Sequence, residues 1–157
     1  MPGPLASRTV DDSRVTMTEI VMPEDTNHHG NIFGGRVLAL IDKASAIAAM
    51  RHCHAPVVTA SIDRVDFLAG AREGSILILE AMLHAAFHTS MEVGVVVHAE
   101  DPLSGARHLT CRALVTLVAV DGSRRPMAVP TLTARTDEEA ARAKEAAQRR
   151  ERRRTHP

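Results

Sequence analysis

A polar loop and the helix predicted after it hold the residue types best suited to chemistry. The loop runs Asn27-His28-His29-Gly30-Asn31-Ile32-Phe33-Gly34-Gly35, and the apolar run 36–50 that follows predicts a largely buried helix. Glycines at a helix start leave backbone N–H groups free, which together with the helix dipole favours a phosphate or a developing oxyanion. Asp42 is the one carboxylate of the run. Because a carboxylate on a core helix is costly unless it is paired or has a chemical role, Asp42 is the first candidate for such a role.

The spacing between the glycines and Asp42 raises the question of how they could work together. Asp42 lies eight residues after Gly34, about 12 Å along a helix, which is far for a carboxylate to serve chemistry at its own helix start. Two helices that meet across a dimer could bring Asp42 of one chain to the glycines of the other. The structural alternative, that Asp42 pairs with an arginine or Lys43 or simply faces solvent, has equal weight on spacing alone.

Several other kinds of site are disfavoured by the sequence. No Gly-Lys-Ser/Thr signature accompanies the glycines, and no strand precedes them in a βαβ unit, which argues against a P-loop and against a dinucleotide fold. His28 and His29 lack partners at metal-ligand spacing, so no metal is expected. Cys53 follows His52 and offers only a weak nucleophile candidate. Two free thiols, Cys53 and Cys111, are favoured over a disulfide.

Composition narrows the class of protein further. The 157 residues predict one domain, and the apolar content of 45% indicates a globular chain. Aromatic residues make up only 2%, which argues against a nucleic-acid module built on base stacking. The chain starts without the apolar core of a signal peptide, and no stretch qualifies as a transmembrane helix. We therefore predict a soluble cytoplasmic protein without a membrane or nucleic-acid partner.

The remaining elements are predicted to be strands, in an α+β arrangement. Alternating or β-rich patterns cover five segments: 15–22, 57–68, 75–87, 89–100 and 107–120. The last four follow one another along the chain, and sequential neighbours are expected to pair as antiparallel hairpins. The simplest packing wraps one curved antiparallel sheet around one long central helix. Because such a sheet leaves long apolar edges exposed, we expect a homodimer with a continuous sheet.

The two ends of the chain are predicted to lie outside the domain, which spans 13–130. Residues 1–12 are rich in Pro, Gly, Ser and Asp and are expected to be flexible. Residues 131–157 form a charged helix or tail, which begins with a capping pattern from Thr136 to Glu139. Oppositely charged side chains stand at i,i+4 spacing in this segment, Glu138 with Arg142 and Glu145 with Arg149. Its only apolar residues after Asp137 are alanines. We expect a solvated segment that adds little to the core, with contact to nucleic acid or phosphates as the weaker alternative.

The loop and helix also carry a resemblance to a known family. The run Pro-Glu-Asp-Thr-Asn-His-His-Gly-Asn-Ile-Phe-Gly-Gly, followed by Leu-Ile-Asp-Lys-Ala, resembles the hotdog-fold acyl-CoA thioesterases. It is most similar to the cytosolic (brain-type) acyl-CoA hydrolase group and its small bacterial relatives. Further matching segments are 51–53, 64–67, 90–93 and the strand 109–118, so the likeness spans about residues 15–130.

This resemblance implies a role for individual residues. Asp42 matches the catalytic acid, a general base or a nucleophile, and Asn27 matches the asparagine that positions substrate or water. Gly34 and Gly35 match the glycine pair whose amides receive the thioester oxygen, and Phe33 stands before them where the animal enzymes frequently have His. Thr89 and Ser90 fall where the family often contacts CoA.

The resemblance also implies an assembly and leaves two rival functions open. In the animal tandem enzymes Asn and Asp are split between two domains, whereas here one chain carries both, so a homodimer could hold two equivalent sites. Related proteins form trimers of dimers, which implies a hexamer. The reaction expected is hydrolysis of acyl-CoA to the free acid and CoA, without a further cofactor. The rivals are a hydratase-like hotdog enzyme, which usually needs an Asp and His pair, and a non-catalytic acyl-CoA-binding protein.

Overall fold

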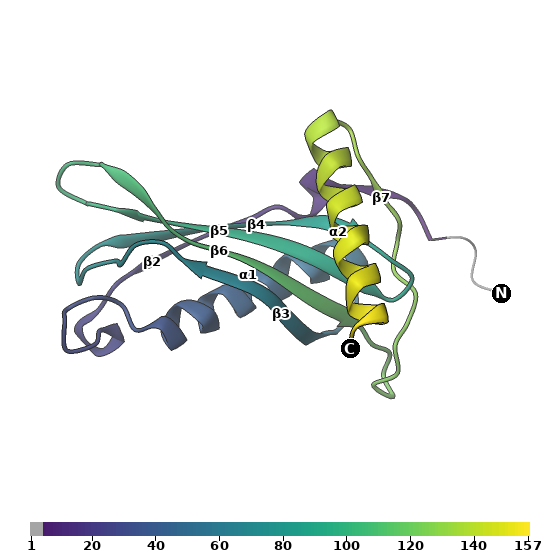
Figure 1. The fold of residues 1–157 in the computed structure, drawn as a ribbon, viewed down its shortest axis with the longest axis horizontal. Helices are drawn as coiled ribbons and strands as arrows, with labels where there is room; N and C mark the ends of the chain where they lie inside the picture. Colours follow the sequence, from purple (N-terminus) through teal and green to yellow (C-terminus); the bar gives the residue numbers. More distant parts are fainter. Residues whose placement is uncertain (1–4) are drawn as a thin grey trace.

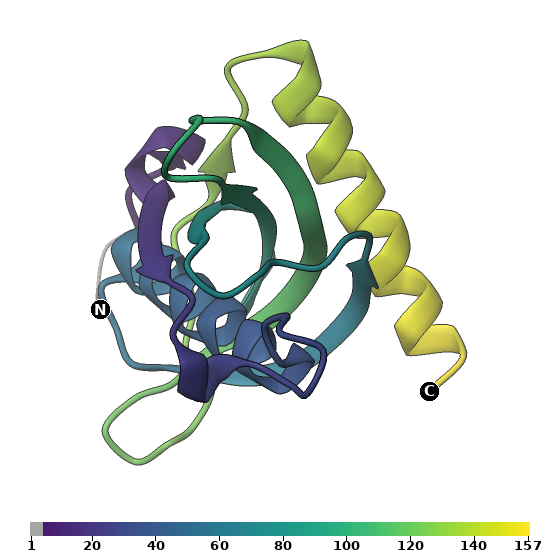
Figure 2. The ribbon, with the colours of Figure 1, turned by 90° about the vertical axis from the view of Figure 1, so that its left-hand side faces the viewer.

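The computed structural model describes residues 5–157, which form a five-stranded antiparallel sheet with one long helix on each face (Figures 1 and 2). The fold is the predicted α+β arrangement, and a short two-stranded parallel pair joins the two ends of the domain. Within residues 5–157 no helix is long and apolar enough to cross a membrane. The elements are β1 (Arg8–Thr9), η1 (Val10–Ser13), β2 (Val15–Ile20), η2 (Pro23–Asp25), α1 (Gly34–Cys53), β3 (Val57–Phe67), β4 (Ile76–Ala86), β5 (Ser90–Glu100), β6 (Arg107–Ala119), β7 (Leu132–Thr133) and α2 (Asp137–Thr155).

The order of strands in the sheet is β2-β4-β5-β6-β3, so β3 lies at an edge. The expectation that sequential strands pair holds for β4 with β5 and for β5 with β6, but it is wrong for β3 and β4. Strand β3 pairs with β6 instead, from Val57 opposite Ala119 to Phe67 opposite Cys111. The segment after β3 bonds to the loop before α1, where the Ile32 amide donates to Ala71. The segment between β3 and β4 therefore lies against the loop before α1, and β4 does not return alongside β3.

The core lies between the sheet and α1. One stripe of α1 is fully buried against the inward-facing side chains of the central strands, as the alternation of each strand requires. The buried α1 residues include Val37, Leu40, Ile41, Ala44 and Ala48; those of the sheet include Leu77, Leu79, Met91, Val93, Val115 and Leu117. The opposite stripe of α1, which carries Gly35, Ala39, Asp42 and Met50, is exposed. In a single chain the helix is therefore covered on one face only, which corrects the expectation of a buried helix.

The start of the chain is more ordered than predicted. Residues 1–4 of the predicted flexible segment lie outside the described residues. Arg8 and Thr9, however, pair in parallel with Leu132 and Thr133, and Val10 is buried. The prediction of a flexible start is wrong for residues 8–12, because their pairing partner comes from the far end of the chain and leaves no local signal.

Helix α2 has the predicted capping, but it is not a solvated tail. The Thr136 hydroxyl accepts a hydrogen bond from the Glu139 amide at 3.1 Å, and Glu138 pairs with Arg142 at 2.6 Å. Figures 1 and 2 show α2 crossing the sheet on the face opposite α1. Ala146 is fully buried there, and the Arg149 guanidinium lies 2.6 Å from the buried carboxylate of Glu92. The prediction of a solvated segment is wrong along this side, because small alanines and paired arginines allow close packing.

Candidate active site

The N-terminus of α1 presents two backbone amides without intrahelical acceptors. Phe33 caps the helix with extended backbone, and its carbonyl accepts from the Arg36 and Val37 amides at 2.9 and 3.2 Å. Gly34 and Gly35 are the first two helical residues. The N–H groups of a first helical turn have no partner within the helix, and the helix dipole adds partial positive charge there. These two amides can therefore hold a carbonyl oxygen that gains negative charge.

Close neighbours explain why these two positions carry glycine. A Cβ atom on Gly35 would lie 2.8 Å from the Phe33 ring, and one on Gly34 would lie 3.7 Å from the Phe67 ring at the end of β3. Gly35 therefore cannot take a side chain unless Phe33 moves. Phe33 is 60% exposed and Phe67 is 54% exposed. Two exposed aromatic rings thus flank the glycine amides in the single chain.

Asn27 shapes the loop that precedes the helix. Its side-chain Oδ1 accepts from the backbone amides of His29 and Asn31 at 3.0 and 3.3 Å, and its own amide donates to the Asn31 carbonyl at 2.8 Å. The loop then turns through Gly30, where φ is +80°. Because Oδ1 is occupied, the Nδ2 group of this half-buried side chain is the one left to donate to a ligand.

Asp42 lies on the exposed stripe of α1 and is held from the neighbouring strand. The Thr59 hydroxyl donates to Asp42 Oδ1 at 2.6 Å. Within residues 5–157 Asp42 makes no ion pair, so the alternative in which it pairs with Lys43 or an arginine is not seen. Its second oxygen remains open to solvent, as a general base or nucleophile requires. Thr59 was missed from sequence because nothing in a strand pattern shows which residue faces a given helix position.

The predicted residues group into two places on one exposed surface. Asn27, Phe33, Gly34 and Gly35 gather at the start of α1, and Asp42 lies two turns further along the same stripe. Edge strand β3 borders both, through Phe67 at Gly34 and Thr59 at Asp42. The stripe is exposed, and among residues 5–157 no strand pairs with the outer edge of β3.

Thr89 and Ser90 lie elsewhere. They form the turn between β4 and β5, where the Thr89 carbonyl accepts from the Ala119 amide at 3.0 Å. Figure 1 shows this turn at the end of the molecule opposite the loop before α1. The single chain thus does not bring Thr89 and Ser90 together with Asn27 or the glycines, and their contact with CoA remains a prediction.

The histidines and cysteines do not form a competing site. His28 and His29 lie ring to ring, with centroids 3.9 Å apart, and the described residues contain no cluster of three His, Cys, Asp or Glu that could hold a metal. Cys53 and Cys111 are free thiols, as predicted. Burial raises the pKa of Cys53, and burial with the nearby Asp66 charge raises the pKa of Cys111 to about 11. Both thiols are thus poor nucleophiles near neutral pH.

The neighbour of Cys53 is also unsuited to act as its base. His52 is fully buried, and its Nε2 lies 2.7 Å from the Pro130 carbonyl oxygen. Burial lowers the pKa of His52. The side chain therefore holds the segment after β6 against α1, a structural contact, and the weak Cys53 nucleophile hypothesis finds no support.

A long helix packed on one face of a single antiparallel sheet, with free glycine amides at its start and an exposed carboxylate two turns on, is the arrangement of a hotdog-fold protein with a candidate thioester site. Comparison with known proteins agrees. Residues 29–106 match the thioesterase superfamily model. The uncharacterised acyl-CoA thioester hydrolase YkhA of Bacillus subtilis is 38% identical over 133 residues, which cover 85% of this chain and 77% of the relative. The chain belongs to the hotdog-fold acyl-CoA thioesterases.

Solved structures extend the likeness to almost the whole chain. An apo-hexameric acyl-CoA thioesterase has a TM-score of 0.92 at 46% identity, covering 96% of this chain and 97% of that one. The acyl-CoA hydrolase of Staphylococcus aureus, solved with butyryl-CoA, CoA and CoA disulfide, has a TM-score of 0.87 at 39% identity, covering 95% and 91%. The mouse cytosolic acyl-CoA thioester hydrolase is 34% identical, but the chain spans only 36% of its length.

Proposed function

We propose that this protein hydrolyses acyl-CoA thioesters to the free acid and CoA, with Asp42 as the reacting carboxylate. The observation that carries this proposal is the Asp42 carboxylate, oriented by Thr59 at 2.6 Å, on the same exposed stripe as the free amides of Gly34 and Gly35. The Staphylococcus aureus hydrolase supports the proposal, since it binds butyryl-CoA and CoA. That enzyme has also been solved with an aspartate, an asparagine or a threonine replaced by alanine, the three residue types of Asp42, Asn27 and Thr59.

The reaction follows from the positions of these groups. The thioester carbonyl oxygen accepts hydrogen bonds from the Gly34 and Gly35 amides, which stabilise the charge that develops as the carbonyl is attacked. Asp42 takes a proton from water, the water oxygen bonds to the carbonyl carbon, the C–S bond breaks, and the proton passes to the leaving thiolate. In the alternative, Asp42 itself attacks, and water then hydrolyses the mixed anhydride. Asn27 Nδ2 donates to substrate or water in either route.

We infer that two chains are needed for a complete site. The separation of Asp42 from Gly34 along α1, about 12 Å, is too long for both to meet one thioester from the same helix. Edge strand β3 and the exposed stripe of α1 offer the surface for a partner, because an unpaired strand edge is a site of strand pairing. A homodimer would place Asp42 of one chain against the glycines of the other. Hexameric relatives support a trimer of such dimers.

Location and cofactor use complete the proposal. We place the protein in the cytoplasm, supported by the cytosolic acyl-CoA hydrolases of mammals among its relatives. Both routes through Asp42 use only water and the thioester, so neither requires a metal or a redox cofactor. Coenzyme A enters as part of the substrate and leaves as product.

A thiol-release assay tests this function. We expect the purified protein to release CoA thiol from acyl-CoAs, with a preferred chain length revealed by a series from acetyl to palmitoyl. Asp42→Asn keeps the shape of the side chain but removes its charge, so kcat should fall by about 10²–10⁴ with the fold intact. Binding of acyl-CoA without any turnover would instead indicate a non-catalytic binding protein, and near wild-type turnover of Asp42→Asn would exclude the proposed role.

A further inference from the structure

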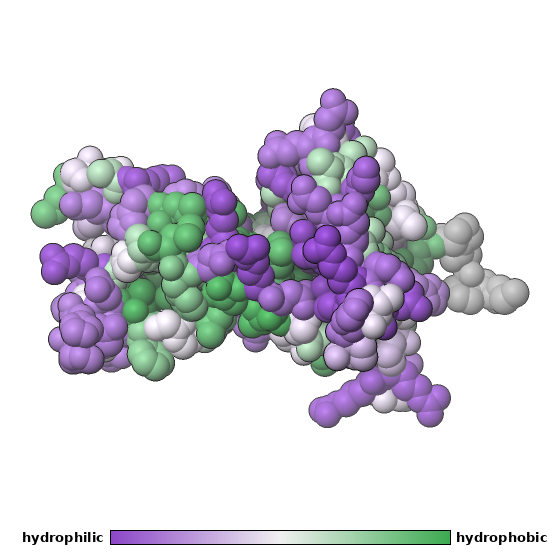
Figure 3. Space-filling model, in the orientation of Figure 1, coloured by the Kyte–Doolittle hydropathy of each residue, from purple (hydrophilic) through white to green (hydrophobic). Residues whose placement is uncertain are grey.

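The loop before α1 carries Asn27 but has few apolar contacts to hold it. Figure 3 shows that the end of the molecule with η2 and the loop is largely hydrophilic. Among residues 23–33 only Ile32 is a buried apolar side chain. A segment with so little apolar anchoring needs polar contacts if its side chains are to meet a ligand in a fixed geometry.

Backbone hydrogen bonds fold this loop back on itself. The Asn27 amide donates to the Asn31 carbonyl at 2.8 Å. Further out, the Phe33 amide donates to the Asp25 carbonyl at 2.7 Å. The two ends of the loop therefore meet at Asp25 and Phe33, and Phe33 is also the residue that caps α1. The position of Asp25 thus determines how the loop lies against the start of the helix.

The Asp25 carboxylate makes two contacts that fix its own position. Its Oδ2 atom accepts a hydrogen bond from the Met22 amide, at the start of η2, at 3.0 Å. Its Oδ1 atom lies 3.2 Å from the Nε atom of Arg36, in the first turn of α1. The Asp25 side chain is only 17% exposed, so solvent screens this ion pair less than it screens a surface pair. One residue therefore ties η2, the loop and α1 together.

Arg36 stands where a cation is unfavourable by itself. The N-terminus of a helix carries partial positive charge, which repels a positive side chain in the first turn. The pair with Asp25 offsets this repulsion. It also neutralises the Asp25 carboxylate, whose charge would otherwise oppose an oxyanion at the two glycine amides. Glu19 of β2 is a second carboxylate neighbour of Arg36, but it lies 3.9 Å away and its side chain is 37% exposed.

We propose that Asp25 is a positioning residue, which together with Arg36 holds Asn27 in a fixed arrangement with the two glycine amides. Asn27 follows Asp25 by two residues, and the glycines follow the far end of the loop directly. The Asp25–Arg36 clamp therefore sets the distance between the Asn27 side chain and the amides. This inference rests on the proposed thioesterase function, in which each chain presents a preformed half of the site and a second chain adds Asp42.

Steady-state thiol release tests the positioning role. Asp25→Ala removes both carboxylate contacts, so we expect kcat to fall by about 10–100-fold, because a displacement of roughly 1 Å can cost that much in rate. KM should change by less than about twofold, since no group that holds substrate is deleted. Asp25→Asn keeps an oxygen that can accept from Met22 and Arg36, so it should recover part of the lost rate. An unchanged kcat in Asp25→Ala would overturn the proposal.

Glu19→Gln is the matched control. Glu19 is also a carboxylate beside Arg36, but among residues 5–157 its only ion pair is to that arginine and it makes none to the loop. Because an exposed pair at that distance contributes little, kcat and KM of this variant should stay within about twofold of wild type. A loss of kcat as large as that of Asp25→Ala would show that the contact with the loop is not what matters, and would overturn the proposal.

Hydrogen–deuterium exchange separates this proposal from the proposed function. A peptide that spans residues 26–33 contains the amides of His29 and Asn31, which donate to Asn27 Oδ1. These amides should exchange at least about tenfold faster in Asp25→Ala than in wild type, and at the wild-type rate in Glu19→Gln. Wild-type protein that releases no thiol would refute the proposed function, and faster exchange in Asp25→Ala would still support the clamp. Unchanged exchange in Asp25→Ala would overturn the clamp, whatever the turnover.

Discussion

Asp42 lies on α1, but the residue that orients its carboxylate comes from the edge strand. The Thr59 hydroxyl donates to Asp42 at 2.6 Å and leaves the second oxygen free. The loop and helix pattern singles out Asp42 and the glycines, because their residue types are unusual in those local settings, and the family resemblance adds Asn27; the catalytic roles of all four stay predictions. Thr59 has no such signal, since a threonine is ordinary in a strand and only the packing of β3 beside α1 gives it a partner.

Replacing Thr59 tests whether it positions Asp42. Thr59→Val keeps the shape of the side chain but removes the donor, so we expect kcat to fall by about 10–100-fold with little change in KM, the pattern for a misaligned reacting group. Thr59→Ser restores the hydroxyl and should recover most of the activity. Steady-state kinetics of both variants give the answer; equal losses in Thr59→Ser and Thr59→Val would show that the hydroxyl is not what matters.

At the scale of elements, α2 and β3 show that sequence patterns predict an element but not its partners in the fold. The capping pattern from Thr136 to Glu139 predicts the start of α2 correctly, yet the alanine and arginine content of the helix predicts a solvated segment, because its contacts are made by small residues and ion pairs. Ala146 is buried and Arg149 reaches Glu92 across 57 residues of sequence. Strand β3 is predicted as a strand, but its position at the edge depends on the loop that separates it from β4. Both errors concern long-range partners.

The Glu92–Arg149 pair gives the attachment of α2 a pH dependence. Burial alone raises the pKa of Glu92, but the two hydrogen bonds and the charge of Arg149, together with the His84 imidazole 3.5 Å away, outweigh it, so the pKa lies below its ordinary value of 4.5. The folded state then binds fewer protons than the unfolded state, and the stabilisation is present above pH 4.5 and is lost as the pH falls through the folded value.

Glu92→Gln should remove this contribution. We expect the variant to lose about 2–3 kcal/mol of unfolding free energy at pH 7, since it leaves a partly buried arginine without its charge partner. The difference from wild type should narrow as the pH falls below about 4.5. Urea unfolding at pH 7, 5 and 3.5 measures it; a difference that stays constant across this range would show that the Glu92 charge does not hold α2.

Truncation after Ala134 tests the packing of α2 as a whole. The shortened chain loses the buried Ala146 and the pairs that Arg149 and Arg153 make with Glu92 and Asp63. We expect the lost contacts to lower the unfolding free energy by about 3 kcal/mol. Because each kcal/mol is worth roughly 2–4 °C in a domain of this size, the melting temperature should fall by about 6–12 °C. Differential scanning calorimetry of the two chains provides the comparison, and an unchanged melting temperature would mean that α2 adds nothing to the fold.

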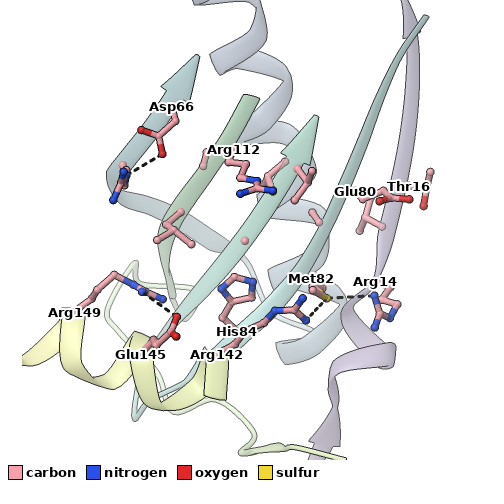
Figure 4. Close-up of a pocket in the computed structure, with 18 residues that line it drawn as sticks. Arg14, Thr16, Asp66, Glu80, Met82, His84, Arg112, Arg142, Glu145 and Arg149 are labelled. Carbon is pink, nitrogen blue, oxygen red and sulfur yellow. Dashed lines mark hydrogen bonds and ion pairs between the residues drawn. The ribbon is translucent and has the colours of Figure 1, made fainter. Parts of the chain in front are cut away.

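At the scale of the whole molecule, the proposed site needs a second chain. The exposed stripe of α1 carries Asp42, the free amides of Gly34 and Gly35 lie two turns away, and the β3 edge beside them is unpaired. The sequence predicts this dependence on a second chain through the spacing of Gly34 and Asp42 and through the apolar strand edges. It does not predict the cavity between α2 and the outer face of the sheet (Figure 4), because that cavity is lined by residues of six separate elements and by Arg14 before β2.

Mixing two inactive variants tests the shared site most directly. Asn27→Ala and Asp42→Ala chains are each expected to be inactive, but a mixed dimer holds one intact site, with Asn27 and the glycines from one chain and Asp42 from the other, and one site with both residues lost. After unfolding and refolding at equal concentration, random pairing makes half of the dimers mixed, so thiol release should recover to roughly a quarter of the wild-type rate. Mixed dimers that are shown to form, by mass spectrometry of differently tagged chains, and that nevertheless stay inactive would contradict the account and place each site within one chain.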